Sequence, residues 1–199
     1  MSMVAIIKYN AGNIASVKNA VERLGHQCVI TDSEVEIRRA DKVIFPGVGE
    51  ASSAMEYLKE RKLDAVIKTL GQPVLGICLG LQLLCRYSEE GNTGCLGIFD
   101  TAVKKFPLTD IVPHIGWDNL KHTESLLFDG FGKDDTVYFV HSYYAESCAQ
   151  TIAECDYILP FSAAMRNRNF YATQFHPEKS AYVGERILEN FLKIRQAND

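Results

Sequence analysis

Cys78 stands in a short segment whose residue types suit a reactive nucleophile. The segment is Gly76-Ile77-Cys78-Leu79-Gly80, between the apolar run 73–75 and the helix-like run 81–84. A nucleophile on a sharp strand-to-helix turn needs small neighbours, because the strained backbone leaves no room for larger side chains. The first N–H groups of the following helix, and its dipole, favour a thiolate and can bind an oxyanion. The segment therefore predicts a cysteine nucleophile with an oxyanion site beside it.

The segment Phe175-His176-Pro177-Glu178 supplies the two further groups that a cysteine nucleophile requires, a base and a residue that orients it. Side chains at i and i+2 of an extended segment share a face. The Glu178 carboxylate can therefore hold one ring nitrogen of His176 and leave the other for Cys78. The thiolate would attack a carbonyl carbon, and His176 would return a proton to a nitrogen leaving group. We predict acyl transfer with loss of ammonia or an amine.

Each motif alone also has a plain structural interpretation. A Gly-x-Cys-x-Gly segment can be a turn with a packed cysteine. An isolated His-Pro-Glu segment is even weaker evidence for a catalytic role. Their joint presence at the ends of two predicted strands favours the chemical interpretation. We expect His26 and His122 to be ordinary surface or core residues, whereas the pattern leaves the roles of His114 and His141 open.

Composition excludes several classes of protein. The chain has 199 residues, with 47% hydrophobic and 23% charged, which fits one globular domain over residues 1–199. A net charge of -4, without a basic run longer than two residues, argues against nucleic-acid binding. No apolar stretch reaches the roughly 20 residues of a spanning helix and no signal pattern opens the chain, so we expect a cytoplasmic protein. The six cysteines form neither a CxxC pair nor a metal-like pattern, so we expect neither metal nor cofactor.

The first half of the chain alternates predicted strands and helices. Strands are expected at 3–9, 28–31, 42–45 and in the run ending at Cys78, and helices at 14–24, 33–39 and 50–70. Residues 10–12 are expected to form a turn, Asn13 a helix N-cap, and Ser33 with Glu36 a capping box. Four such units with apolar strands indicate a parallel sheet covered on both faces, with a site at the carboxyl ends of the strands.

The second half of the chain has a different pattern, with shorter predicted strands separated by turns. They lie at 101–105, 116–120, 137–140, 151–155, 162–166 and 170–175, before a closing helix at 181–195. We therefore expect an α/β fold whose mostly parallel central sheet carries a mixed or antiparallel extension.

Cys78 with Gln82 four residues on, together with the F-H-P-E segment, resembles a class I glutamine amidotransferase. The resemblance extends nearly end to end, and further segments are similar to the glutaminase subunits of imidazole glycerol phosphate synthases: 9–13, 46–49, 113–117 and 139–143. It implies a flavodoxin-like fold. It also implies that Cys78 attacks the side-chain amide of glutamine, that ammonia leaves, and that water releases glutamate from a glutamyl thioester.

The resemblance also implies roles for residues around the nucleophile. The oxyanion hole would use N–H groups of Leu79 and of the loop Gly47-Val48-Gly49, whose glycines allow a peptide to flip. Substrate contacts would come from Gln82, Val140, His141, Ser142 and Tyr143, although each of these could instead be a packing residue.

A partner is implied as well, a separate (β/α)8-barrel cyclase that receives the ammonia. The barrel would make imidazole glycerol phosphate and an aminoimidazole carboxamide ribonucleotide in histidine biosynthesis, and the 47–49 loop would switch on with the partner. The predicted interface residues are Lys8, Asn10, Asn13, Trp117, Asp118 and Tyr138. Three of them depart from the usual family pattern, which has Asp, Gly and Asn at positions 8, 10 and 118.

Three alternatives stay open at this point. The chain could be the glutaminase subunit of another synthase, such as anthranilate synthase, although the 113–117 segment argues against it. It could be a non-catalytic scaffold subunit with a silent thiol, or a free-standing cysteine amidase or peptidase that needs no partner.

Overall fold

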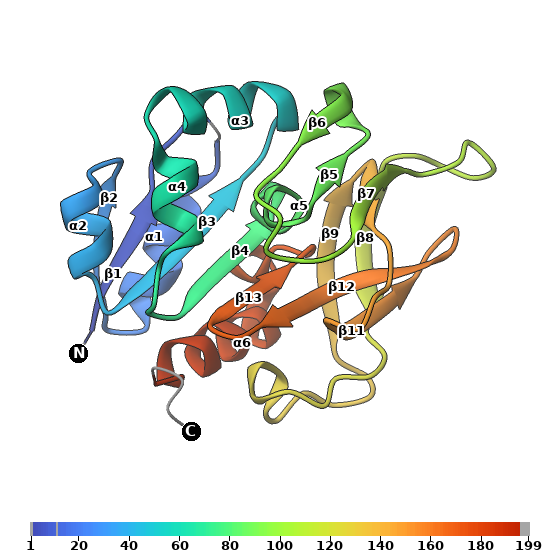
Figure 1. The fold of residues 1–199 in the computed structure, drawn as a ribbon. Helices are drawn as coiled ribbons and strands as arrows, with labels where there is room; N and C mark the ends of the chain where they lie inside the picture. Colours follow the sequence, from blue (N-terminus) through green and yellow to red (C-terminus); the bar gives the residue numbers. More distant parts are fainter. Residues whose placement is uncertain (1, 11, 196–199) are drawn as a thin grey trace.

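The computed structural model describes residues 2–10 and 12–195 and has a seven-stranded central sheet. The strand order is β11-β12-β13-β4-β3-β1-β2 (Figure 1). The parallel strands are β1 (Met3–Ile7), β2 (Gln27–Thr31), β3 (Lys42–Gly47), β4 (Val74–Cys78) and β13 (Phe170–Thr173). The antiparallel strands β11 (Thr151–Asp156) and β12 (Pro160–Asn167) extend one edge. The predicted α/β class and its extension are confirmed.

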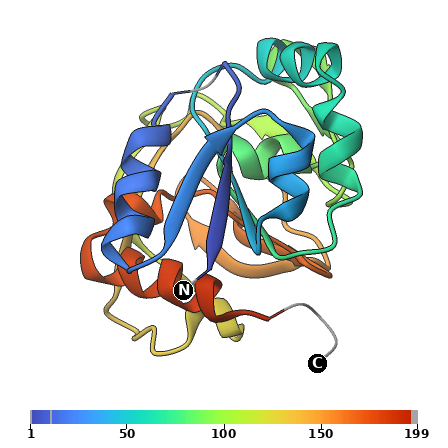
Figure 2. The same ribbon diagram turned by 90° about the vertical axis from the view of Figure 1, so that its left-hand side faces the viewer.

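Helices cover both faces of this sheet (Figure 2). One face carries α1 (Ile14–Arg23) and α6 (Ala181–Lys193), and the other carries α2 (Glu34–Arg39), α3 (Ala51–Glu60), α4 (Leu63–Lys68) and α5 (Leu79–Leu84). Neighbouring strand residues point to opposite faces, so Ile44 packs with α1 and α6 whereas Phe45 packs with the other helices. This two-sided burial explains why the central strands are unbroken apolar runs in the sequence.

Two smaller sheets lie beyond the carboxyl ends of the central strands. One joins β10 (Tyr143–Ala145), β7 (Ala102–Lys105), β5 (Tyr87–Ser88) and β6 (Thr93–Gly94), and the other is a ribbon of β8 (His114–Asn119) and β9 (Thr136–His141). Three single 3-10 turns complete the description: η1 (Glu90–Asn92), η2 (Leu126–Phe128) and η3 (Pro177–Lys179). Strands β5, β6 and β10 were not predicted, since two or three residues show no periodicity.

Asn13 and Ser33 occupy the predicted N-cap positions, but neither side chain makes the expected capping hydrogen bond. Asn13 precedes α1, but its φ is 69° and its side chain makes no capping hydrogen bond, donating instead to Glu178. Ser33 makes no capping bond either, and Glu36 accepts from the Thr31 hydroxyl. In both cases a side chain outside the helix forms the hydrogen bond in place of the helix backbone: Glu178 with Asn13, and Thr31 with Glu36.

Other boundaries differ from the predictions in smaller ways. The helical run at 50–70 is broken into α3 and α4 at Lys62, whose φ is 58°. Helix α6 ends at Lys193 rather than 195, and the predicted turn at 10–12 includes residue 11, outside the described residues. Among the described residues, no helix is both long enough and apolar enough to cross a membrane.

Candidate active site

Cys78 ends β4 and immediately precedes α5, as the elbow prediction requires. Its φ of 53° and ψ of -106° form a backbone conformation that non-glycine residues rarely adopt. A Cβ on Gly80 would lie 1.8 Å from the backbone oxygen of Phe45, and one on Gly76 would lie 2.8 Å from Leu84. Both flanking glycines are therefore required, because neighbouring atoms pack too closely for a side chain on either side of Cys78.

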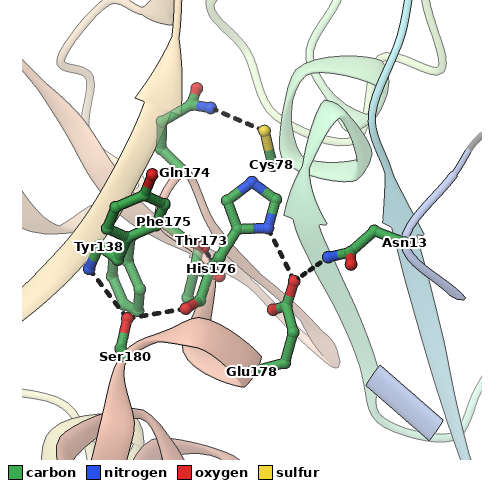
Figure 3. A network of polar contacts seen from close by, with 9 residues as sticks. All are labelled: Asn13, Cys78, Tyr138, Thr173, Gln174, Phe175, His176, Glu178 and Ser180. Atoms are coloured by element: carbon green, nitrogen blue, oxygen red, sulfur yellow. Dashed lines mark hydrogen bonds and ion pairs between the residues drawn. The ribbon is translucent and has the colours of Figure 1, made fainter. Parts of the chain in front are cut away.

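His176 and Glu178 form the pair expected beside the nucleophile. Nδ1 of the buried imidazole is 2.8 Å from Oε1 of the buried carboxylate. His176 itself is extended, but the next three residues form η3, so the predicted extended segment is wrong while the predicted contact is confirmed. Nε2 of His176 has no hydrogen-bond partner among the described residues, and the ring lies between Cys78 and Glu178 (Figure 3).

The surroundings of His176 favour its protonated form. Burial alone would lower the pKa of the imidazole, but Cys78 and then Glu178 outweigh that effect and raise the pKa to about 10. An imidazolium at neutral pH is the partner that stabilises a thiolate. The geometry and the charge balance therefore support an activated cysteine.

The backbone of His176 is fastened to strand β9. Its N–H donates to the Tyr138 carbonyl over 2.9 Å, and the Tyr138 N–H donates to Ser180 Oγ over 2.9 Å. Ser180 Oγ in turn donates to the His176 carbonyl over 2.7 Å (Figure 3). This loop of three hydrogen bonds fixes the catalytic ring relative to the ribbon.

Gln174 is a site residue that the sequence analysis missed. It is fully buried, its Nε2 donates to Cys78 Sγ over 3.7 Å, and its Oε1 accepts from Gln82 Nε2 over 3.0 Å. Gln82 Nε2 also donates to the Tyr143 carbonyl over 3.0 Å. The available signal was spacing, because Gln174 precedes His176 by two residues and Glu178 by four.

A pocket of about 320 Å³ opens beside Cys78. Eight of its lining residues were predicted as oxyanion or substrate contacts: Val48, Gly49, Leu79, Gln82, Val140, His141, Ser142 and Tyr143. Gly47 is not among the lining residues, and a Cβ there would lie 1.9 Å from the Tyr9 hydroxyl, which donates to the Pro46 carbonyl. Gly47 is thus a packing glycine, placed opposite Cys78 in the β3–β4 pairing.

Glu90 and Pro113 also line this pocket and were not predicted. Glu90 Oε2 accepts from the Ala51 N–H over 2.8 Å, and burial raises the pKa of its carboxyl group. Glu90 lies in none of the motifs of the sequence analysis, whereas Pro113 opens the 113–117 segment, and the fold brings both residues to the pocket beside Cys78. Within residues 2–10 and 12–195, no group of three or more His, Cys, Asp or Glu side chains could hold a metal ion.

The predicted interface residues occupy two regions. Lys8 and Asn10 are exposed after β1, whereas the Asn13 side chain is turned inward to Glu178. On the ribbon, Trp117 is 51% exposed and meets Tyr138 edge to face with ring centroids 5.8 Å apart. The Asp118 carboxylate lies 3.4 Å from Nε2 of His114.

The glutamine amidotransferase class-I family model matches residues 5–194. The chain belongs to this family. Among curated relatives of the amidotransferase, the imidazole glycerol phosphate synthase subunit HisH of Bacteroides fragilis strain YCH46 is 60% identical over 194 residues, covering 96% of this chain and 99% of the relative. The HisH subunit of Pasteurella multocida is 44% identical over 195 residues, covering 97% and 98%.

Solved structures share the fold of this amidotransferase at low sequence identity. PurLQS from Thermotoga maritima has a TM-score of 0.72 at 16% identity, covering 96% of this chain and 98% of that one. The glutaminase domain of Trypanosoma brucei CTPS, with bound acivicin, has a TM-score of 0.65 at 18% identity, covering 97% and 94%. These likenesses show the fold alone.

Proposed function

We propose that this amidotransferase is the glutaminase subunit of an imidazole glycerol phosphate synthase in histidine biosynthesis. The observation that carries the glutaminase chemistry is the buried His176–Glu178 pair beside a cysteine held at a strained elbow. The similarity to HisH subunits over nearly the full length of both chains supports the choice of synthase. A cytoplasmic location is part of the same proposal.

The reaction follows from the positions of three side chains. Cys78 Sγ attacks the side-chain amide carbon of glutamine, and His176 Nε2 gives its proton to the amide nitrogen as the carbon–nitrogen bond breaks and ammonia leaves. Water then attacks the glutamyl thioester, His176 takes its proton, and the thiolate departs with release of glutamate. Glu178 holds Nδ1 throughout, which keeps Nε2 directed at the reacting atoms.

The oxyanion would be stabilised at the start of α5. The Leu79 N–H is the first of this helix, directly after the nucleophile, and Leu79 lines the pocket. A second N–H would come from the 48–49 peptide. Gly49 has a φ of 126° and no atom within 4 Å of a would-be Cβ, so this peptide has room to reorient. That freedom supports a loop that switches when the partner binds.

Glutamine recognition would use polar groups among the lining residues of the pocket. Glu90 supplies a carboxylate on one wall, suited to the α-ammonium group of the substrate. The 140–143 segment supplies backbone groups on another. Gln82 would act mainly as a wall, because its amide nitrogen already donates to Tyr143 and Gln174.

The ribbon β8–β9 is the surface best suited to the cyclase partner. Ile115 and Trp117 point outward from β8, at 59% and 51% exposure, and Tyr138 lies against Trp117. Aromatic residues of this kind anchor protein interfaces. A closed contact here would keep ammonia from protonation by bulk water on its way to a (β/α)8-barrel.

The test is the Cys78→Ala variant, assayed in complex with the cyclase partner in the presence of its nucleotide ligand. We expect glutamine-dependent synthesis to be lost and ammonia-dependent synthesis to remain, because only the ammonia source is removed. Cys28→Ala, in a half-buried cysteine of β2, is the matched control and should keep both activities. Glutamine hydrolysis by Cys78→Ala would overturn the mechanism, and full turnover by the isolated wild-type chain would overturn partner dependence.

A further inference from the structure

A chain of polar side chains leads from the surface of β8 to the glutamine pocket. The Asp118 carboxylate lies 3.4 Å from His114 Nε2, and His114 Nδ1 lies 3.2 Å from His141 Nε2. His141 Nδ1 lies 2.8 Å from the Tyr143 carbonyl. Asp118 is partly exposed, whereas both histidines are at most 6% exposed. The chemistry described so far uses neither imidazole.

Aromatic rings hold the two histidines in place. The His114 ring stacks on Tyr157 at 4.0 Å between centroids and on Phe139 at 4.7 Å. The His141 ring lies 5.2 Å from Phe161 and 5.4 Å from Phe106, again between centroids. With the rings held between these aromatic side chains, a proton that moves between ring nitrogens changes which hydrogen bonds they make.

The positions of the protons follow from the acceptors at the two ends. Burial lowers the pKa of His141 to about 3, and burial also lowers the pKa of His114, so both rings are neutral at physiological pH. The Tyr143 carbonyl requires a proton on Nδ1 of His141, which leaves Nε2 as an acceptor. His114 can serve that acceptor only with its own proton on Nδ1.

The Asp118 carboxylate competes for the same proton. A carboxylate is an acceptor, so it favours the His114 tautomer with the proton on Nε2. In that tautomer two lone pairs, on His114 Nδ1 and His141 Nε2, face each other across 3.2 Å. A neutral or donating group at position 118 removes the competition and allows His114 to donate to His141.

We propose that Asp118 and His114 are positioning residues that, through His141, set the pocket turn 141–143 by the choice of His114 tautomer. The inference rests on the proposed glutaminase function. A cationic or hydrogen-bond-donating group that a partner brings to Asp118 would shift the proton to Nδ1 and hold the turn in place. The charge next to Asp118 at the surface would thus determine the position of the Tyr143 carbonyl in the pocket.

The Tyr143 carbonyl is linked to the nucleophile through the side-chain amides of Gln82 and Gln174. The Tyr143 carbonyl also accepts from Gln82, Gln82 donates to Gln174, and Gln174 donates to Cys78 Sγ. The turn that His141 supports is therefore in hydrogen-bonded contact with the reactive sulfur. A displaced Tyr143 carbonyl would disturb both the pocket wall and this chain of amides.

Few other charged groups lie close enough to affect the hydrogen bonds of the relay, the series Asp118, His114, His141 and the Tyr143 carbonyl. In the described part of the chain, no lysine or arginine forms an ion pair with Asp118. The remaining titratable neighbours are Tyr157 over His114, His176 near His141, and Cys155, whose pKa is raised by burial and then by the charges of Asp118 and Asp156. Asp118 Oδ1 already accepts from the Asn119 N–H over 3.0 Å. Oδ2, the oxygen beside His114, keeps lone pairs that can accept from a donor outside the chain.

The first test reads the tautomer directly in the isolated chain. Nitrogen-15 chemical shifts of the imidazole rings should show the His114 proton on Nε2 in wild type and on Nδ1 in Asp118→Asn, where the amide can donate to Nε2. The same tautomer in both proteins would overturn the proposal. This measurement needs neither the partner nor enzymatic activity.

The second test uses two variants of His114 in the complex with the cyclase partner. The amide nitrogen of His114→Asn replaces Nδ1, the group that donates to His141, whereas that of His114→Gln replaces Nε2. Both variants lose the aromatic stacking equally. We expect the KM for glutamine to rise about fivefold in His114→Gln, the effect of one net hydrogen bond, with a lower kcat because the amides that lead to Cys78 Sγ are disturbed. His114→Asn should keep a near wild-type KM and kcat.

Equal KM values in the two variants would show that His114 acts by packing alone and would overturn the proposal. Ammonia-dependent synthesis should be wild type in both and reports whether the complex is intact. If the wild-type complex hydrolysed no glutamine, the proposed function would fail, while the tautomer measurement would still decide the relay.

Discussion

Asn13 donates a hydrogen bond from its side-chain amide to Oε1 of Glu178, the same oxygen that accepts from His176. The loop after β1 is thereby joined to the catalytic pair, although Asn13 and Glu178 are 165 positions apart in sequence. The second carboxylate oxygen, Oε2, is buried without a partner among the described residues. The orientation of Glu178 therefore depends on Asn13 as well as on His176.

Replacing the amide by a carboxylate should disturb this arrangement. Asn13→Asp places a second acceptor against Glu178, so we expect kcat for glutamine hydrolysis in the complex to fall about tenfold. Asn19→Asp is the control, because it makes the same chemical change at an exposed position of the helix α1 that follows Asn13. If both variants lost activity equally, added negative charge in this region rather than contact with Glu178 would be the cause.

Gln174 should matter for catalysis as well as for packing. Gln174→Met keeps the length of the side chain but removes the contact to Cys78 Sγ and the acceptor for Gln82, so we expect kcat to fall about tenfold. Gln72→Met is a matched control, since Gln72 is also buried and donates to a carbonyl, that of Ile37. Steady-state glutaminase kinetics of the two complexes will separate these effects. A wild-type kcat in Gln174→Met would contradict the assignment.

Replacing a glycine of the elbow by a larger residue should destabilise the folded protein. In Gly80→Ala the new Cβ would overlap the Phe45 carbonyl oxygen, a backbone atom that cannot move alone, so we expect a loss of about 3 kcal/mol in the free energy of unfolding. Gly71→Ala adds the same atom at an exposed site with nothing within 4 Å and should change stability by less than about 1 kcal/mol. Urea unfolding monitored by circular dichroism measures both.

The raised pKa of His176 predicts how stability depends on pH. The protonated ring is favoured in the folded state, so its contribution is fully present below the ordinary pKa of about 6.5. It should decrease as the pH rises from there through the folded-state value of about 10. The measurement is the difference in unfolding free energy between wild type and His176→Gln at several pH values. A difference that grew with pH would contradict the sign of this shift.

The nucleophile, its base and the alternating architecture could be predicted because their signals are local. Gly76, Cys78 and Gly80 lie within five residues, and His176 and Glu178 within three. Central strands such as β4 are buried on both sides and leave unbroken apolar runs. Spacing and periodicity are therefore sufficient for these features.

The remaining parts of the site depend on contacts between distant segments. Glu90 and Pro113 reach the pocket only through the fold, and Asn13 gives its polar group to Glu178 instead of to its own helix. Local rules place Asn13 correctly at the N-cap of α1 but miss the partner of its side chain, because a buried carboxylate 165 positions away accepts from the amide. The pairing of His114 with His141 could not be predicted for the same reason, since it requires the register of β8 and β9.

The attachment of His176 to Tyr138 has a consequence for inhibitor design. Tyr138 is held to the catalytic histidine through its backbone and touches Trp117 through its ring. A small molecule wedged against the Trp117–Tyr138 edge would press on β9, the strand to which the backbone of the base is hydrogen-bonded, while leaving the glutamine pocket empty. Such a compound would not need to resemble glutamine, and selectivity over other glutamine-using enzymes could be sought on a surface where shape, rather than substrate chemistry, decides binding.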